Sequence, residues 1–139
     1  MCYNSNCSIE LKSTIDEETS VFSAKGRVIK THSDMHFDYC LDGDKCTLTV
    51  GDGEVVQARR GEQNINLTFK KGENTECVLD IGGFSGTVPV YTVDMQHNVC
   101  SINRRFGAVH VFMLTIVYMF GEQKTKINFS AKYTSREKI

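Results

Sequence analysis

The sequence predicts an all-β protein that folds as a single antiparallel, up-and-down β-barrel. Three observations carry this prediction. Apolar and polar residues alternate with a period of two in many short runs of the 139-residue chain, as they do in strands that bury one face. Short stretches rich in Gly, Asn and Asp separate the runs, so neighbouring strands are expected to pair as hairpins. No window carries the i, i+3, i+4, i+7 apolar spacing of an amphipathic helix.

The predicted strands follow one another in chain order, each bounded by turn residues. Apolar residues recur at every second position in the runs 7–15, 35–41, 46–50, 65–69, 77–81 and 127–133. Turns are expected at 42–44, 51–53, 71–74 and 121–122. Roughly eight to eleven short strands joined in this way favour a meander that closes into a barrel. The length is that of one domain, so a single domain over residues 1–139 is expected.

The stretch CVLDIGGFSGTVPVYT, residues 77–92, could hold either a phosphate-binding loop or a hairpin turn. A dinucleotide-binding fingerprint needs glycines in the order G-x-G-x-x-G at the start of a helix. Here Gly82, Gly83 and Gly86 lead into residues 87–93, whose β-branched side chains predict a strand. A hairpin turn is therefore expected. Pro89 cannot donate a backbone hydrogen bond, which predicts an edge position or a bulge in that strand.

The most apolar run, residues 108–120, has apolar side chains on both faces of its predicted strand. In a barrel made of one layer, one of these faces must lie outside. A partner subunit could cover it and so form a homodimer. A segment packed from residues 1–20 could cover it equally well, and both alternatives stay open.

Charge and composition exclude several classes of partner. Sixteen Lys and Arg oppose seventeen Asp and Glu, for a net charge of −1, so no global field attracts nucleic acid or an anionic membrane. No apolar run approaches the ~20 residues of a membrane-spanning helix. The first residues lack the basic and apolar regions of a secretory signal, so a cytoplasmic location is expected. The six cysteines are then expected to be free thiols, and no CxxC pair indicates a zinc ribbon.

Candidate ligand-binding residues come from three regions of the chain. Arg59 and Arg60 lie near a predicted strand end, and two guanidinium groups at a barrel rim can bind an anionic head group. His110 falls in phase with the inward residues of the 108–120 strand, where it could line a pocket. Tyr91 completes the predicted set. The alternative interpretations are solvated arginines near turns and a histidine in a core or interface.

Two His and two Asp residues alternate at every second position: His32, Asp34, His36 and Asp38. On a strand they would share one face, where imidazole and carboxylate groups can bind a metal ion together. The alternatives are a solvent-facing polar surface or a turn before the strand begins. Because no further cluster of ligands is visible, no metal site is predicted, and no catalytic residue or cofactor is assigned.

A series of short motifs runs from residue 47 to about residue 130. It comprises TLTV at 47–50, EVV at 54–56, RGE at 60–62, LTFKKG at 67–72 and GTVPV at 86–90, followed by two long strands around Gly121. In this order the chain resembles the YwiB-like family of small bacterial proteins, a domain of unknown function. Two features depart from the family: Phe84 and Ser85 replace a Pro-Tyr pair, and the 108–120 strand is more apolar. The resemblance implies a calycin-like, lipocalin-like β-barrel and brings no established activity.

The residues and the resemblance together favour a cytoplasmic barrel, without enzymatic activity, that binds a small and largely apolar ligand in its interior, with polar contacts at the mouth. A small barrel can hold one such ligand or be filled by its own side chains. The second hypothesis is therefore an interaction protein, a homodimer through an apolar outer strand with a filled barrel and no ligand. A third and weaker hypothesis is an enzyme that uses the 32–38 cluster.

Overall fold

A computed structural model describes residues 3–105 and 107–135. These residues form ten antiparallel strands and contain no helix. Each strand pairs with its neighbours in the chain, and β1 closes the barrel by pairing with β10. The predicted all-β, up-and-down barrel is thereby confirmed. The strands are β1 (Tyr3–Ile15), β2 (Glu18–Lys30), β3 (Met35–Leu41), β4 (Asp44–Val50), β5 (Val55–Arg60), β6 (Gln63–Phe69), β7 (Asn74–Ile81), β8 (Phe84–Arg104), β9 (Gly107–Phe120) and β10 (Gln123–Ser135).

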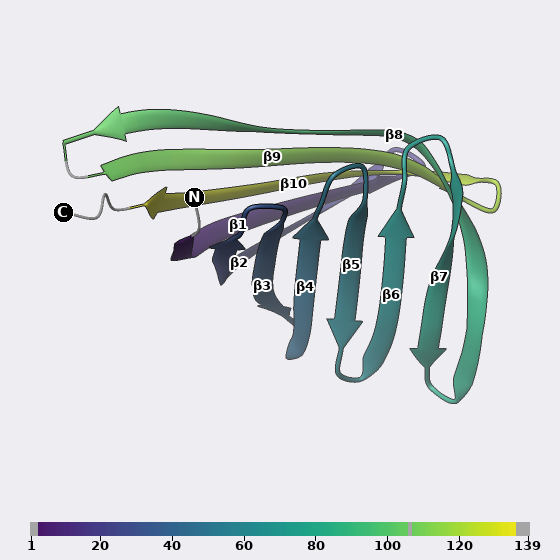
Figure 1. Ribbon diagram of the computed structural model, residues 1–139. Coiled ribbons are helices and arrows are strands. Elements are labelled where there is room, and N and C mark those ends of the chain that lie inside the picture. The colour runs from purple at the N-terminus through teal and green to yellow at the C-terminus, as the bar shows by residue number, and fades with distance from the viewer. Residues whose placement is uncertain (1–2, 106, 136–139) are drawn as a thin grey trace.

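Long and short strands divide the barrel into two parts. In Figure 1, β8, β9, β10 and β1 run side by side as an extended sheet, and the short strands β3 to β7 lie to one side of it. β7 pairs with β8 only as far as Tyr91, whereas β9 follows β8 to Arg104. The register of β8 shifts between Thr92 and Asp94, and such a bulge bends its strand. The second half of β8 therefore projects beyond the short strands.

The centre of the barrel is filled by its own aromatic side chains. Phe37, Phe112 and Phe129 are at most 2% exposed, and their ring centroids lie 5.0, 5.1 and 6.2 Å apart. Phe69 and Tyr118 form a second pair at 5.0 Å. Tilted and edge-on rings at these distances stabilise a core beyond the area that they bury. The middle of the barrel is thus a packed core.

The glycine-rich stretch forms the hairpin turn expected from the sequence. Gly82 and Gly83 connect β7 to β8 with φ of 53° and 85°, which side chains other than glycine rarely adopt. Pro89 lies opposite Glu76 of β7, and the pairing of β9 with β8 begins one residue later. A strand therefore lies on only one side of Pro89, which confirms its edge position.

The outer face of β9 carries apolar side chains that no described segment covers. Val109 and Val111 are half-buried there, and Met113 is 46% exposed. β1 lies within the sheet, between β10 and β2, so the expectation that the first twenty residues pack over this face is wrong for residues 3–15, which belong to β1. The alternative of a partner subunit stays a prediction.

The five described cysteines are unpaired thiols. Cys7, Cys46 and Cys77 are buried and Cys40 and Cys100 are exposed, while Cys2 lies outside the described residues. Among residues 3–105 and 107–135 there is no helix of the length and apolarity needed to cross a membrane. The cytoplasmic location stays a prediction.

Candidate functional site

One end of the barrel is formed by the turns at 42–43, 61–62 and 82–83, and lies at the bottom of Figure 1. We call this end the mouth. Inward-pointing side chains of two kinds lie near it. The polar corner, on β3 to β5, consists of Tyr39, Asp44, Gln57 and Arg59. The apolar wall, on β6 to β8, consists of Ile65, Leu79, Ile81 and Phe84.

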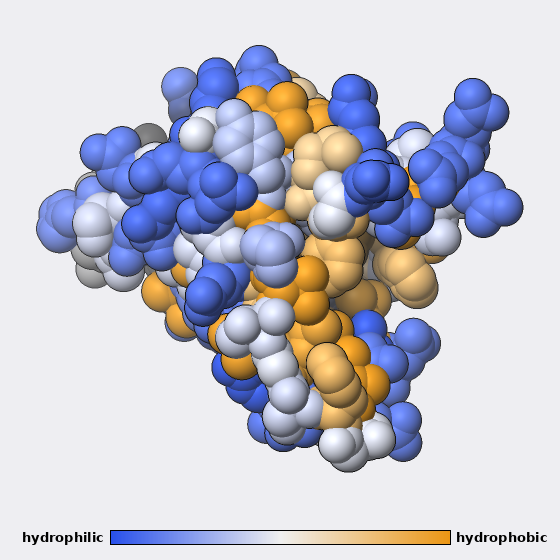
Figure 2. All heavy atoms as spheres, turned by 90° about the vertical axis from the view of Figure 1, so that its right-hand side faces the viewer, coloured by the Kyte–Doolittle hydropathy of each residue, from blue (hydrophilic) through white to orange (hydrophobic). Residues whose placement is uncertain are grey.

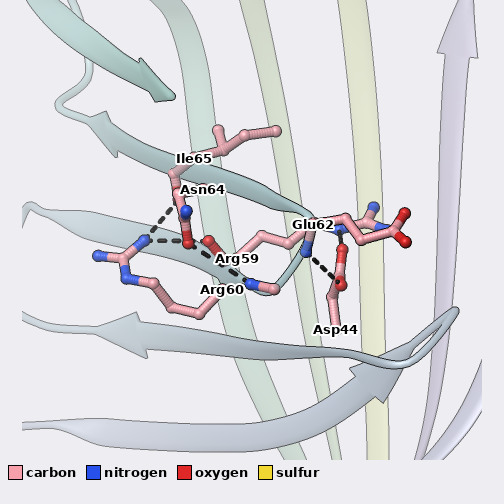
Figure 3. Close-up of polar contacts among 7 residues, drawn as sticks. Asp44, Arg59, Arg60, Glu62, Asn64 and Ile65 are labelled. Atoms are coloured by element: carbon pink, nitrogen blue, oxygen red, sulfur yellow. Dashed lines mark hydrogen bonds and ion pairs between the residues drawn. The ribbon is translucent and has the colours of Figure 1, made fainter. Parts of the chain in front are cut away.

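An ion pair between Asp44 and Arg59 joins two hairpins at the mouth. Arg59 lies opposite the buried Cys46, so its side chain points inward, and its Nε donates a hydrogen bond to Oδ2 of Asp44 at 2.7 Å. The backbone N–H of Glu62 donates to the other oxygen of Asp44 at 3.1 Å (Figure 3). The side chain of Asp44 is 6% exposed and that of Arg59 27%. The guanidinium thus keeps its outer N–H groups, because only its Nε takes part in a contact within the described structure.

The turn beside this ion pair leaves no room for a side chain larger than that of glycine. A Cβ atom on Gly61 would overlap Oδ1 of Asp44. The absence of a Cβ lets the carboxylate approach the turn closely enough to accept the N–H of Glu62. Asp44 therefore links the start of β4 to the turn between β5 and β6.

The Arg59 guanidinium, followed by the N–H of Glu62, holds the pKa of the Asp44 carboxyl below its ordinary value. Asp44 in turn raises the pKa of Arg59 through the same hydrogen bond. A carboxyl whose pKa is lower in the folded chain stabilises the fold above its unfolded pKa of about 3.9. That stabilisation is lost as the pH falls through the folded pKa.

We expect Asp44→Asn to lower the free energy of unfolding at neutral pH, because the amide cannot balance the charge of Arg59. The deficit against wild type should be constant above about pH 5 and should shrink as the pH falls below about 4. Urea unfolding across this range measures it. Asp52→Asn, in the exposed turn between β4 and β5, is the matched control. Equal stability of the two variants at pH 7 would contradict the role given to Asp44.

The hydroxyl of Tyr39 is a buried polar group without a partner in the described structure. Tyr39 is 5% exposed, and its Oη makes no hydrogen bond. The nearby Gln57 and Arg59 lower the pKa of this hydroxyl, but the Oη of Tyr39 does not reach hydrogen-bond geometry with a partner in the described structure. Burial, together with the nearby Cys46, outweighs both residues and raises the pKa of Tyr39 to about 12. A buried hydroxyl of this kind costs about 1–3 kcal/mol unless a partner is supplied.

The apolar wall continues the inner face of the barrel outward from the packed core. Ile65 and Leu79 are half-buried against that core. Phe84 lies opposite Ile81 on the same inner face and is 60% exposed, with its ring next to Gly86. The exposed ring of Phe84 therefore presents apolar surface at the end of the barrel where the polar corner lies. Figure 2 views the outside of the barrel from the side of β7 and β8, where a band of apolar side chains also runs down the surface.

Two of the predicted ligand-binding residues, Arg59 and Arg60, are adjacent in β5 and therefore point to opposite faces of the sheet. Arg60 lies opposite Lys45 on the outer face, and its Nη1 donates to the carbonyl oxygens of Arg59 and Ile65 at 3.0 and 3.2 Å (Figure 3). Only Arg59 reaches the mouth. The expected pair of arginines at one rim is therefore not formed.

Tyr91 and His110, the other predicted ligand-binding residues, lie away from the mouth. Tyr91 lies between two fully buried residues of β8, so its side chain faces outward, and it is 40% exposed. His110 lies on the projecting sheet, where Nδ1 contacts Oγ of Ser101 and Nε2 contacts Oγ of Ser135, both at 2.7 Å. The structure therefore does not bring the four predicted residues into one site.

The alternation of His and Asp near residue 36 forms a polar surface contact. Nε2 of His36 lies 2.6 Å from Oδ1 of Asp38, and Nδ1 lies 2.9 Å from Oγ1 of Thr49. Both ring nitrogens are therefore engaged. His32 lies in the turn before β3, and the described ranges contain no group of three or more potential metal ligands.

Of the residues that form the mouth, the sequence predicts only Arg59 as a site residue; Tyr39, Asp44 and Phe84 are among those that it does not predict. The sequence pattern places Tyr39 on the apolar face of its strand and Asp44 in a turn, and it gives neither residue a role in a site. Asp44 is nevertheless in phase with the inward residues Cys46 and Leu48, which indicates that it points inward. Nothing in the sequence distinguishes Phe84 from any other residue that follows a turn.

A solved structure, the crystal structure of the ywiB protein from Bacillus subtilis, is similar to this chain. The similarity has a TM-score of 0.73 and covers 95% of this chain and 94% of that chain, at 16% sequence identity. This similarity supports a YwiB-like fold. No family model matches the chain, and neither does any curated protein. Fold does not imply function, so the similarity assigns no activity.

Proposed function

We propose that this protein is a non-enzymatic barrel that binds a small, largely apolar and uncharged molecule at its mouth. The unpartnered hydroxyl of Tyr39 carries the proposal, because a bound polar atom would supply the hydrogen bond that this buried group lacks. Arg59 offers further N–H donors beside it. The apolar wall offers the body of the ligand a surface to contact.

The charge of the polar corner favours an uncharged ligand. Asp44 already balances the charge of Arg59 at 2.7 Å, so the corner as a whole is neutral. An anionic head group, expected when the arginines are considered alone, would approach the Asp44 carboxylate as well. A ligand with a hydroxyl or carbonyl oxygen on an apolar body meets both surfaces. The packed aromatic core favours a ligand at the mouth over one in the centre of the barrel.

The proposal also includes membership of the YwiB-like family and a calycin-like architecture. The order of short motifs after residue 47 supports both, together with the similarity of fold over nearly the whole chain. No reaction is assigned to the mouth, where the Asp44 carboxylate is already hydrogen-bonded on both oxygens.

We test the proposal with n-decanol, an apolar molecule with one hydroxyl group, followed by NMR chemical-shift changes in the backbone amides. Wild type should show saturable shifts at Tyr39, Leu79 and Phe84. Phe84→Ser should weaken binding about tenfold or more, since an aromatic contact surface is lost. Tyr39→Phe should weaken it by about two- to tenfold, for one hydrogen bond.

The matched control is Val78→Ser, because Val78 is 46% exposed on the outer face of β7, next to Leu79 in the chain. Its affinity for n-decanol should equal that of wild type. Shifts centred on Val78 and Tyr91, with no change at the mouth, would contradict the proposal.

An interaction protein is the second candidate, and the uncovered outer face of β9 favours it. Met113 is 46% exposed there, and Ile102 on the neighbouring β8 is 60% exposed. Exposed apolar surface of this kind is common where proteins associate. Met113→Lys would weaken association through this face and leave n-decanol binding unchanged.

A further inference from the structure

The second half of β8 has a backbone edge without a partner strand in the described part of the chain. One edge of this segment, 94–104, pairs with β9, whereas on the other edge the pairing of β8 with β7 extends only to Tyr91. The backbone groups of Thr92 bond to Gly72 and Glu73, and no described backbone group bonds to the edge beyond Thr92. In Figure 1 this part of β8 is the outermost strand of the extended sheet. An open edge of this length can pair with another strand.

The composition of this edge differs from that of a protected one. Proteins prevent edge strands from pairing by means of lysine, proline or inward-pointing charges. From Met95 to Asn103 the edge contains no proline, lysine, arginine or carboxylate. Val99 on its inner face is 43% exposed and Ile102 on its outer face is 60% exposed. Nothing in these residues opposes the approach of a second strand.

We propose that this edge pairs, antiparallel, with the same edge of a second copy of the chain, around a two-fold axis at Val99. The opposite charges at the two ends of this edge favour a second copy of the chain as the partner. They also determine the register in which the two edges pair. With the axis at Val99, Asp94 lies opposite Arg104 of the partner subunit, and Arg104 lies opposite the partner's Asp94. Val99 then contacts Val99 of the partner subunit, which buries the exposed apolar side chain.

The charged side chains that would meet in this register lie on the same face of the sheet. A two-fold axis perpendicular to a sheet brings together only residues whose side chains point to the same face. Asp94 pairs with Val117 and Arg104 with Gly107, in phase with the outer side of β9, so both side chains lie on the outer face. Asp94 already contacts Lys71 at 3.2 Å, while Arg104 has no ion-pair partner among the described residues. The partner's Asp94 would supply one.

A second open edge of the described sheet, on β2, does not carry opposite charges that could pair in this way. β3 pairs with β2 only from Gly26 onward, so residues 18–25 of β2 also lack a partner on that side. Their charged ends, Glu18 and Lys25, are an odd number of positions apart and so lie on opposite faces. If two copies of this edge paired within one sheet, Glu18 of one copy and the partner's Lys25 would lie on opposite faces and could not form an ion pair. The edge of β8 is therefore the self-complementary one.

Sedimentation equilibrium on the full chain tests the proposal. Wild type should approach twice the monomer mass of 15.6 kDa as its concentration rises. Val99→Lys places two lysines together at the axis and should weaken the dimer at least about tenfold. Val78→Lys, at a similarly exposed position on the outer face of β7 and away from this edge, is the matched control and should dimerise like wild type. A monomeric wild type at the highest soluble concentration, or a dimer that Val99→Lys leaves intact, would overturn the proposal.

A charge exchange tests the register and excludes misfolding as an explanation. Arg104→Glu alone and Asp94→Lys alone should each be monomeric, because each homodimer would juxtapose like charges. A mixture of the two variants should form a heterodimer, in which every facing pair is again opposite in charge. Unfolded or damaged variants could not recover in this way. A mixture that associates no better than its components would overturn the register around Val99.

Discussion

Phe37→Ala is expected to lower the free energy of unfolding by about 3–5 kcal/mol, the loss typical of a fully buried phenylalanine. Phe37 is 0% exposed, and its ring lies 5.0 Å from that of Phe112 and 5.1 Å from that of Phe129. Removing it leaves a cavity between rings that are held by different strands. The other strands of a closed barrel limit how far the wall can move inward to fill that space.

Urea unfolding measures this loss, with Phe22→Ala as the control. Phe22 lies on the inner face of β2, opposite Leu11, but is 40% exposed. Its removal should lower the free energy of unfolding by only about 1 kcal/mol, because this half-exposed side chain buries less apolar surface than Phe37 does. Equal losses for the two variants would mean that the aromatic cluster does not form the core of this protein.

Gly26→Ala is expected to cost about 3 kcal/mol, the upper end of the range for overfilled cores. Gly26 lies on β2 between Cys7 and Tyr39. An added Cβ would overlap the backbone oxygen of Asp38 and lie 3.0 Å from Cδ1 of Ile9. Because the obstruction is backbone, β2 and β3 would have to separate where they pair.

Gly86→Ala is the matched control for this prediction in urea unfolding. Gly86 also lies within a strand, but the atom nearest to its added Cβ belongs to the exposed ring of Phe84, at 3.3 Å. That ring can move, so the loss should stay below about 1 kcal/mol. If Gly26→Ala proved as stable as Gly86→Ala, the close approach of β2 to β3 would be contradicted.

The barrel could be predicted because most of its strands bury one face. The period of two identifies β3 and β4, where buried residues recur at alternate positions. It does not identify β2, whose first six residues are exposed on both faces and whose Gly26 interrupts the apolar series. It also fails for the second half of β8, where residues 96–104 are all exposed. A strand that projects from the barrel has no buried face to mark it in the sequence.

The mouth could be predicted only in part. The sequence indicates Arg59 because two arginines precede a turn, where they can bind an anion together. Adjacent residues of a strand point to opposite faces, however, and so Arg60 lies outside. The same alternation places Tyr91 outside, between two buried neighbours. The contact of Asp44 with Arg59 depends on the pairing of β4 with β5 and on the space beside Gly61. Such contacts between strands are a property of the register, which the alternation alone does not specify.

A crystal structure of protein purified gently from its native host, without added ligand, tests the central claim most directly. The account predicts a bound molecule at the mouth, with a polar atom within hydrogen-bond distance of Oη of Tyr39 and an apolar part against Phe84. A mouth that holds only water, with Tyr39 hydrogen-bonded to Gln57, would contradict it.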